Sequence, residues 1–385
     1  MPMKIDNAVN VEDLRRMAKR RLPRAVFDFI EGGVEDEHGI ARNESAFSHH
    51  RLLPRYLVDV SKRDQSAVLF DRKYASPFGI SPTGFAALFR PGADLMLAES
   101  AAAANIPFVM SGSSTAAIEA AARVAPSHTW YQLYAARDRK ISEDLIRRAR
   151  DAGFSTLVLT VDVPIGSKRE RNIRNNFGLA LQMRWSTIAE ALTHPGWIAR
   201  YLRHGMPVFE NWASYASATD AMTVARLVTR QTPSTVIWKD LEDFRRLWPR
   251  TLVVKGILHP DDARQAAELG VDGIVVSNHG GRQLDRAPAS LEMLPALHAA
   301  VGSKVVLMLD SGVRRGADIV TALCLGAQFV FVGRATVYGA AAAGIPGVRK
   351  AISILQDEID RILAQIGCPT VEGLGPEFLL RDGAG

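Results

Sequence analysis

The stretch VVLMLDSGVRRGADIVTALCLGAQFVFVGR, residues 305–334, contains two apolar runs separated by an amphipathic segment. The runs, Val305–Leu309 and Phe329–Val332, have the length and apolar content of strands that are buried on both faces. Between them, Arg315–Leu325 places apolar side chains three and four positions apart, which indicates a helix. A strand, a helix and a strand in this order predict one unit of a parallel sheet.

The same unit recurs from Pro77 to Gly333. Eight strand-then-helix units in sequence favour a closed (β/α)8 barrel, a TIM barrel, over an open doubly wound sheet, which is the structural alternative. The intervening helices include Asp138–Ala152 and Pro260–Leu269. The eight predicted strands are Phe78–Ser81, Pro107–Met110, Trp130–Leu133, Leu157–Thr160, Leu252–Val254, Gly273–Val276, Val305–Leu309 and Phe329–Val332.

We predict that residues 1–385 form a single domain. A helical lead-in over residues 1–76, with helices at about Asn10–Gly32, precedes a barrel over residues 77–340, and residues 341–385 form a C-terminal helix and tail. The gap from Thr160 to Leu252 is far too long for one helix and its loops. It therefore contains an insertion, residues 163–235, after the fourth strand.

Composition excludes several classes of protein. The chain is 47% hydrophobic and 23% charged, as folded globular proteins are. The chain contains no run of about 18 apolar residues, so we expect no conventional transmembrane helix. The N-terminal residues lack the apolar core of a signal peptide. Cys324 and Cys368 are far apart, so we expect packing roles in a reduced compartment and no metal site. The net charge of +6 suits an anionic membrane or an acidic substrate, but the basic residues match no nucleic-acid reading motif.

Polar residues and glycines follow every predicted strand. In a barrel of this kind the carboxyl ends of the strands converge on one mouth, where the chemistry takes place. All eight strands therefore deliver hydrogen-bonding groups to the same rim. The sets are Pro82-Thr83-Gly84, Ser111-Gly112, Gln132-Leu133-Tyr134, Thr160-Val161-Asp162, Lys255-Gly256, Ser277–Arg282, Asp310–Arg314 and Gly333-Arg334.

The last two sets predict a phosphate site, because glycine lets backbone N–H groups approach a ligand and the arginines beside Gly312 and Gly333 add positive charge. His279, in a glycine-flanked turn, is a candidate general base that Asp162 would orient. Arg282 and Arg169 can each hold a carboxylate with two hydrogen bonds, which indicates an anionic substrate. Arg169 could instead belong to a charged surface stretch.

The segment Ser277–Asp285, SNHGGRQLD, resembles the signature of the FMN-dependent 2-hydroxy acid dehydrogenase and oxidase family. The likeness runs from about Val11 to Pro369 and is supported by Pro82-Thr83-Gly84, Tyr131–Tyr134 and Val254–Gly256. The stretches Ile359–Pro369 and Arg203–Pro207 are most similar to the mandelate dehydrogenase branch.

This resemblance implies that FMN lies across the barrel mouth and that an (S)-2-hydroxy acid is oxidised to the 2-keto acid. The expected substrate is (S)-mandelate or a related aromatic acid, with L-lactate oxidation, or an oxidase using O2, as the alternative. His279, paired with Asp162, would take a proton from the substrate, while Arg282 and Arg169 hold its carboxylate and Tyr134 touches its oxygen. Whether the proton leaves carbon or oxygen stays open. The implied FMN set is Pro82, Thr83, Gly84, Ser111, Gln132, Thr160, Lys255, Ser277, Asp310, Ser311, Gly312, Val313, Arg314, Gly333 and Arg334.

Two positions refine this expectation. Family members usually have tyrosine where Phe29 stands, and its hydroxyl helps to bind the substrate carboxylate, so Phe29 leaves the side-chain preference open. Gly84 stands where oxidases of the family more often carry alanine, and it favours a dehydrogenase.

Residues 175–215 combine arginines with large apolar residues and contain only two acidic residues, Glu190 and Glu210. Such a segment suits the membrane interface, and the matching segment of the mandelate branch anchors the enzyme there. A lid on the barrel mouth is the alternative. The resemblance further implies a cytoplasmic enzyme, peripheral on the inner face of the cytoplasmic membrane, a quinone-type electron acceptor and a homotetramer.

Overall fold

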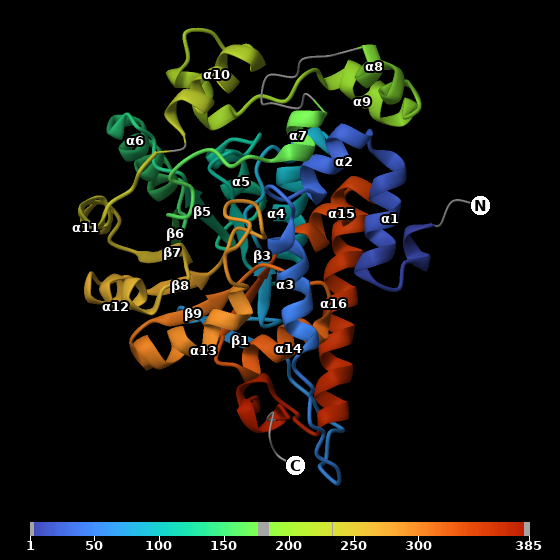
Figure 1. The fold of residues 1–385 in the computed structure, drawn as a ribbon, viewed down its shortest axis with the longest axis vertical. Coiled ribbons are helices and arrows are strands. Elements are labelled where there is room, and N and C mark those ends of the chain that lie inside the picture. Colours follow the sequence, from blue (N-terminus) through green and yellow to red (C-terminus); the bar gives the residue numbers. More distant parts are fainter. Residues whose placement is uncertain (1–3, 176–184, 233, 381–385) are drawn as a thin grey trace.

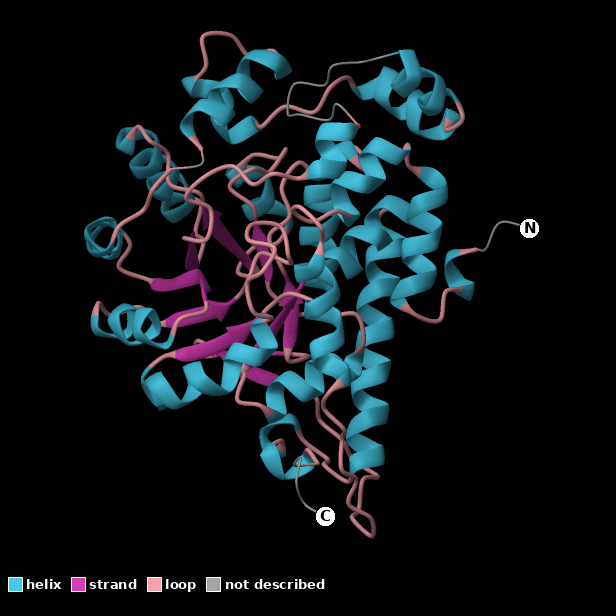
Figure 2. Ribbon diagram, viewed as in Figure 1, coloured by secondary structure: helices cyan, strands magenta, loops and turns pink. Residues whose placement is uncertain are grey.

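A computed structural model describes residues 4–175, 185–232 and 234–380. Its eight parallel strands form a closed barrel in the order β10-β3-β4-β5-β6-β7-β8-β9, which confirms the predicted (β/α)8 fold (Figure 2). The barrel closes where β10 pairs with β3, with Val330 opposite Phe78. The strands are β3 (Phe78–Ile80), β4 (Phe108–Met110), β5 (Thr129–Leu133), β6 (Thr156–Thr160), β7 (Thr251–Ile257), β8 (Gly273–Val276), β9 (Val306–Leu309) and β10 (Phe329–Val332).

Each barrel strand is followed by a helix that covers its outer face (Figure 1). These helices are α4 (Ala93–Ala103), α5 (Ile118–Val124), α6 (Arg139–Asp151), α11 (Trp238–Leu247), α12 (Pro260–Glu268), α13 (Ser290–Val301), α14 (Gly316–Cys324) and α15 (Arg334–Ala343). Outside this repeat lie α1 (Val11–Arg21), α2 (Arg24–Glu31), α3 (His38–Ser48), α7 (Glu170–Arg174), α8 (Trp185–Leu192), α9 (Pro195–His204), α10 (Ala221–Gln231), α16 (Ile345–Ile366) and the 3-10 turns η1 (Ile5–Asn7), η2 (Ala86–Leu88), η3 (Glu210–Tyr215), η4 (Gly302–Lys304), η5 (Val371–Gly373) and η6 (Pro376–Phe378).

The lead-in is not helical throughout, because β1 (Ala67–Leu69) and β2 (Arg72–Tyr74) form an antiparallel hairpin. Its turn residues, Phe70 and Asp71, both have positive φ, as a two-residue hairpin turn requires. The hairpin packs into the amino end of the barrel, where buried side chains from the strand interiors meet it. This inner cluster comprises Ala67, Leu69, Tyr74, Val109, Trp130, Val158, Val253, Val275, Met308, Phe329 and Phe331.

The insertion after β6 lies over the carboxyl ends of the strands, with α8 and α9 beside α1 and α2 (Figure 1). Two buried tryptophans hold the insertion against the barrel through hydrogen bonds. Trp212 donates a hydrogen bond from Nε1 to Gly112 O over 2.8 Å, and Trp197 donates one to Leu88 O over 3.0 Å. In the parts of the chain that the structure describes, no helix is long and apolar enough to cross a bilayer.

The apolar residues of segment 175–215 therefore divide into two groups. Trp197 faces the barrel, whereas Leu192 and Leu202 are 65% and 76% exposed. Residues 176–184, part of the predicted membrane surface, lie outside the described residues.

Candidate active site

A cavity of about 480 Å³ lies at the carboxyl ends of the strands, and residues at or after every barrel strand line it. Gln132, Asp162 and Ser277 lie behind the lining residues, in hydrogen-bond contact with them. The other predicted residues line the cavity: Phe29, Pro82, Thr83, Gly84, Ser111, Tyr134, Thr160, Arg169, Lys255, His279, Arg282, Asp310, Ser311, Gly312, Val313, Arg314, Gly333 and Arg334.

His279 is held between a carboxylate and a phenol. Its Nδ1 lies 2.9 Å from Asp162 Oδ1, and its Nε2 lies 3.2 Å from the Tyr134 hydroxyl. Burial lowers the pKa of His279, although the Asp162 carboxylate opposes this, so the imidazole is neutral at neutral pH. Burial alone would raise the pKa of Asp162, but His279 and Lys255 outweigh it and hold that pKa below its usual value. Because Nδ1–H then donates to Asp162, Nε2 carries the lone pair and accepts a hydrogen bond from the Tyr134 hydroxyl, so Nε2 is the basic nitrogen on the cavity side.

Gly256 makes room for Asp162 and was not assigned a role from the sequence. A Cβ at this position would lie 2.6 Å from both Cβ and Cγ of Asp162, and the φ of Gly256 is +107°. The register between β7 and β8 shifts here, between Lys255 and Ile257. A glycine inside a strand signals such a close approach, but only the barrel register shows what approaches it.

Lys255 carries a positive charge into the floor of the cavity. Its Nζ lies 3.1 Å from Asp310 Oδ2 and donates to Ser277 Oγ over 2.9 Å. Ser81 and Ser311 donate to the two oxygens of Asp310 over 3.0 and 2.9 Å. Burial alone would lower the pKa of Lys255, but the carboxylates of Asp310 and Asp162 outweigh it and raise that pKa, so the ammonium stays charged.

A second network of hydrogen bonds connects the ends of three strands, β4, β5 and β6. Gln132 accepts hydrogen bonds at Oε1 from Ser111 Oγ over 3.2 Å and from Gly112 N over 3.1 Å. Its amide donates to Thr160 Oγ1 over 2.9 Å. The side chains of Ser111 and Thr160 are thereby fixed where they line the cavity.

Two arginines join the rim to the end of α2. Arg282 donates from Nη1 to Gly32 O over 2.6 Å, and Arg334 donates from Nε to Ile30 O over 3.0 Å. Cations are favoured at these C-terminal helix carbonyls. Burial lowers the pKa of Arg282 strongly, and the charges of Arg169 and Arg334 lower it further.

Positive charge therefore exceeds negative charge at the mouth. Arg169 donates to Ser167 Oγ over 3.1 Å and to Gln283 Oε1 over 3.3 Å, so it belongs to the cavity wall rather than to an outer charged surface. Arg314 pairs with Glu44 at 2.8 Å. No salt bridge to Arg169, Arg282 or Arg334 is present among the described residues. Partly buried cations without carboxylate partners favour an anionic ligand.

The loops after β9 and β10 present backbone groups to the same region. Ser311 and Gly312 have φ near +80°, and the Ser311 hydroxyl accepts a hydrogen bond from Gly280 N over 3.0 Å. Gly312 passes so close to α3 that a Cβ would lie 2.2 Å from Asn43 O. Gly333 caps the N-terminus of α15, where free N–H groups favour an anion.

An aromatic wall adjoins the arginines. The guanidinium carbon of Arg282 lies 5.5 Å from the centre of the Phe29 ring. Phe29 packs on Phe85 and Phe89 with centroids 6.4 and 6.1 Å apart, and Phe85 stacks on Phe209 at 4.9 Å. All four phenylalanines line the cavity. The sequence did not reveal Phe85, Phe89 and Phe209 as site residues, because only the fold brings the segment of Phe85 and Phe89 beside Phe29 and Phe209.

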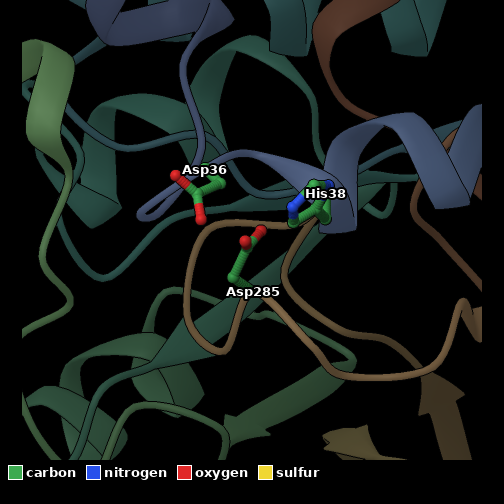
Figure 3. A group of neighbouring side chains, drawn as sticks. All are labelled: Asp36, His38 and Asp285. Carbon is green, nitrogen blue, oxygen red and sulfur yellow. The ribbon is translucent and has the colours of Figure 1, made fainter.

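Asp36, His38 and Asp285 point toward one another beside this region (Figure 3). Their potential ligand atoms lie within 4.8 Å of one another. Asp36 and His38 are exposed, and the buried carboxylate of Asp285 accepts a hydrogen bond from Gly39 N over 3.0 Å. That bond holds the start of α3 against the loop after β8, which accounts for Asp285. We assign the group no metal.

Replacing Lys255 by Met should destabilise the fold by about 3–5 kcal/mol, because the Asp310 carboxylate stays buried without its cation. The double variant Lys255→Met/Asp310→Asn removes both charges and should be more stable than the single variant. Urea denaturation of the two variants and the wild type measures the difference. A double variant at least as unstable as Lys255→Met would contradict the buried-charge explanation.

Comparisons with known proteins agree with this geometry. Residues 18–381 match the model of the FMN-dependent dehydrogenase family. The chain is 42% identical to (S)-mandelate dehydrogenase of Pseudomonas putida over 98% of its length and 95% of that protein. It is 36% identical to a peroxisomal (S)-2-hydroxyacid oxidase of Arabidopsis thaliana, over 96% of each chain. A crystal structure of (S)-mandelate dehydrogenase, described as a monotopic membrane protein, superposes with a TM-score of 0.94 at 41% identity, covering 98% of this chain and all of that one. The chain therefore belongs to the FMN-dependent dehydrogenase family.

Proposed function

We propose that the protein uses FMN to oxidise (S)-mandelate, or a related aromatic (S)-2-hydroxy acid, to the 2-keto acid. The observation that carries the substrate class is the aromatic wall of Phe29, Phe85, Phe89 and Phe209 beside Arg282. A carboxylate bound at Arg282 leaves the remainder of a small acid within reach of these rings. The similarity to a mandelate dehydrogenase supports the same substrate class.

The donor set of the cavity fits FMN. The positive-φ backbone at Ser311 and Gly312, the N-terminus of α15 and the guanidinium of Arg334 suit a phosphate. Lys255 places a charged ammonium where it would stabilise negative charge on the flavin ring. A Cβ at Gly84 would lie 2.9 Å from Ser113 Cβ, so the glycine keeps the wall beside the ring in place.

We assign Asp310 to the ribityl chain, and the remaining contacts to the ring or chain fall to the polar groups that the cavity presents. FMN, when bound, supplies the acceptor for the two electrons that leave the substrate. The residues assigned to the ring or chain are Pro82, Thr83, Ser111, Gln132, Thr160, Ser277 and Val313, and the phosphate set is Gly312, Arg314, Gly333 and Arg334.

The protein's own part in the chemistry is to place the acid and to remove its proton. Arg282 and Arg169, both partly buried and without carboxylate partners among the described residues, bind the substrate carboxylate. Tyr134 contacts the substrate oxygen. His279 accepts the proton at Nε2, and the Asp162 carboxylate at Nδ1 stabilises the resulting imidazolium.

Replacing His279 by Asn should keep FMN bound but slow flavin reduction by (S)-mandelate by about 10²–10⁴-fold, because the general base is lost. Anaerobic flavin absorption measures this step, with L-lactate as the second substrate and O2 uptake as the test for an oxidase. Reduction of the variant at the wild-type rate would contradict the assignment.

The pH dependence of kcat/KM offers a second check. His279 must be neutral to act, so activity is present above its lowered pKa and is lost as the pH falls through it. In Asp162→Asn the carboxylate that raises the pKa of His279 is gone. The acid limb of the variant should therefore move to lower pH while kcat falls, and an unmoved limb would contradict the pairing.

Phe29→Tyr should restore a hydroxyl beside Arg282 and lower KM for L-lactate about 10-fold or more, because a hydrogen bond to a charged group contributes about 1.5–3 kcal/mol. L-Lactate has no phenyl ring to pack on the aromatic wall, so it depends more on its carboxylate contacts. Phe29→Leu, which lacks both ring and hydroxyl, is the control. Equal KM values for L-lactate in Phe29→Tyr and the wild type would show that the position does not reach the carboxylate.

We further propose that segment 175–215 attaches the protein to the inner face of the cytoplasmic membrane, that a quinone-type carrier accepts the electrons, and that four copies assemble. The exposed Leu192 and Leu202 and the scarcity of acidic residues support attachment. The quinone and the tetramer rest on the family resemblance. The full-length protein should float with vesicles that contain an anionic lipid, and protein that stays in the dense fraction without detergent would refute attachment.

A further inference from the structure

A small cavity lies between α9 and the turn that precedes α4, outside the candidate active site. Trp197 fixes its two sides together through the hydrogen bond to Leu88 O, and its ring stacks on Tyr201 with centroids 5.3 Å apart. The volume of about 10 Å³ admits about one water-sized group. A larger ligand would present one oxygen to the cavity and stay outside it. The lining residues are Ala87, Leu88, Pro91, Trp197, Arg200, Tyr201, Gly205 and Pro207.

Three arginines from three different elements gather here. Arg200 lies on α9 and lines the cavity, Arg90 lies in the turn beside it, and Arg21 is the last residue of α1. Burial lowers the pKa of Arg90 to about 10, and the charges of Arg200 and Arg21 contribute. Burial and the charge of Arg21 likewise lower the pKa of Arg200. The cations are therefore close enough to repel one another.

Nothing acidic balances these charges within the described ranges, where none of the three arginines forms a salt bridge. Residues 176–184, NFGLALQMR, lie outside the described residues, and their sequence contains no Asp or Glu. Glu190 is engaged elsewhere, since it accepts a hydrogen bond from Arg24 N over 2.6 Å. Arg90 instead donates from Nε to Ala340 O, over 2.8 Å, at the end of α15.

Arg200 carries the second observation that points to a ligand. Its Nε atom is buried and has no hydrogen-bond partner among the described residues. A buried charged donor without an acceptor is costly, so an acceptor is expected at this place. A phosphate group suits it, because its oxygens match the guanidinium fork and its charge offsets three cations at once.

We propose that Arg21, Arg90 and Arg200 form a binding site for a phosphate group, presented by the head group of an anionic phospholipid. The exposed Leu192 and Leu202 lie on α8 and α9, the pair of helices that carries Arg200, so this part of the insertion also presents apolar side chains outside the cavity. This inference rests on the proposed membrane attachment. It adds to it a specific contact between the three arginines and a lipid phosphate, in place of a diffuse positive charge.

Vesicle flotation of the full-length holoenzyme tests the site with Arg200→Gln and a matched control, Arg203→Gln. Arg203 is exposed on the same helix and does not line the cavity, so both variants lose one charge from α9. On phosphatidylcholine vesicles that contain phosphatidylglycerol, Arg203→Gln should weaken binding about fivefold, as one basic residue near a surface does. Arg200→Gln should weaken it at least tenfold more than that. Equal losses in the two variants would overturn the site.

Two further measurements separate the possible ligands. Vesicles that carry oleate, an anion without phosphate, should not distinguish Arg200→Gln from Arg203→Gln, and a preserved difference would overturn phosphate recognition. Inorganic phosphate, compared with chloride at equal ionic strength, should raise the melting temperature of the wild type more than that of Arg200→Gln. If phosphate raises the melting temperature but the wild-type protein does not float with the vesicles, the phosphate site is supported and a lipid as the source of the phosphate is overturned. No shift and no flotation would overturn both.

Folding and the main activity are followed in the same samples. Arg200 lies outside the candidate active site, so flavin content and (S)-mandelate turnover of Arg200→Gln should equal those of the wild type. Arg200→Lys, which keeps the charge but not the fork, should recover the electrostatic part of vesicle binding only. Full recovery in Arg200→Lys would show that charge alone acts here and would overturn the site.

Discussion

Closure of the barrel between β10 and β3 is the constraint on which the rest of the structure depends. Once Val330 pairs with Phe78, the carboxyl ends of eight strands face one volume, and every polar residue that follows a strand is delivered to it. The catalytic candidates come from strand ends far apart in the sequence, Asp162 after β6 and His279 after β8. Their 2.9 Å contact is a consequence of register rather than of local sequence.

The rim also depends on a segment outside the barrel. The carbonyl groups at the end of α2 receive Arg282 and Arg334, so the helix that carries Phe29 is held by the same cations that favour an anionic ligand. Structural and functional demands on these arginines coincide. Burial without carboxylate partners costs free energy, and that cost is reduced by backbone carbonyls and by any anion that enters.

The sequence predicts the barrel, its eight strands and most residues of the candidate site, because apolar runs and the residues after them are local signals. It does not reveal the β1–β2 hairpin, whose strands have three residues each and whose Phe-Asp turn lacks the usual Asn-Gly signal. Nor does it reveal the partners of Gly256 or of Phe209, since these depend on strand register and on how the insertion folds back. Composition likewise does not show which apolar residues of the insertion are buried, as Trp197 is, and which are exposed, as Leu202 is.

The β1–β2 hairpin determines from which end of the barrel a ligand can enter the cavity. Its side chains fill the amino end of the barrel, so within the described residues the carboxyl mouth is the way into the cavity. Under the proposed function, the organic acid and the electron acceptor use this same opening. With one opening, the keto acid leaves before the acceptor approaches, so the two half-reactions are separated in time: the acid binds the oxidised form of the enzyme and the acceptor binds the reduced form. Kinetics of the ping-pong type follow from how the far end of the barrel is closed.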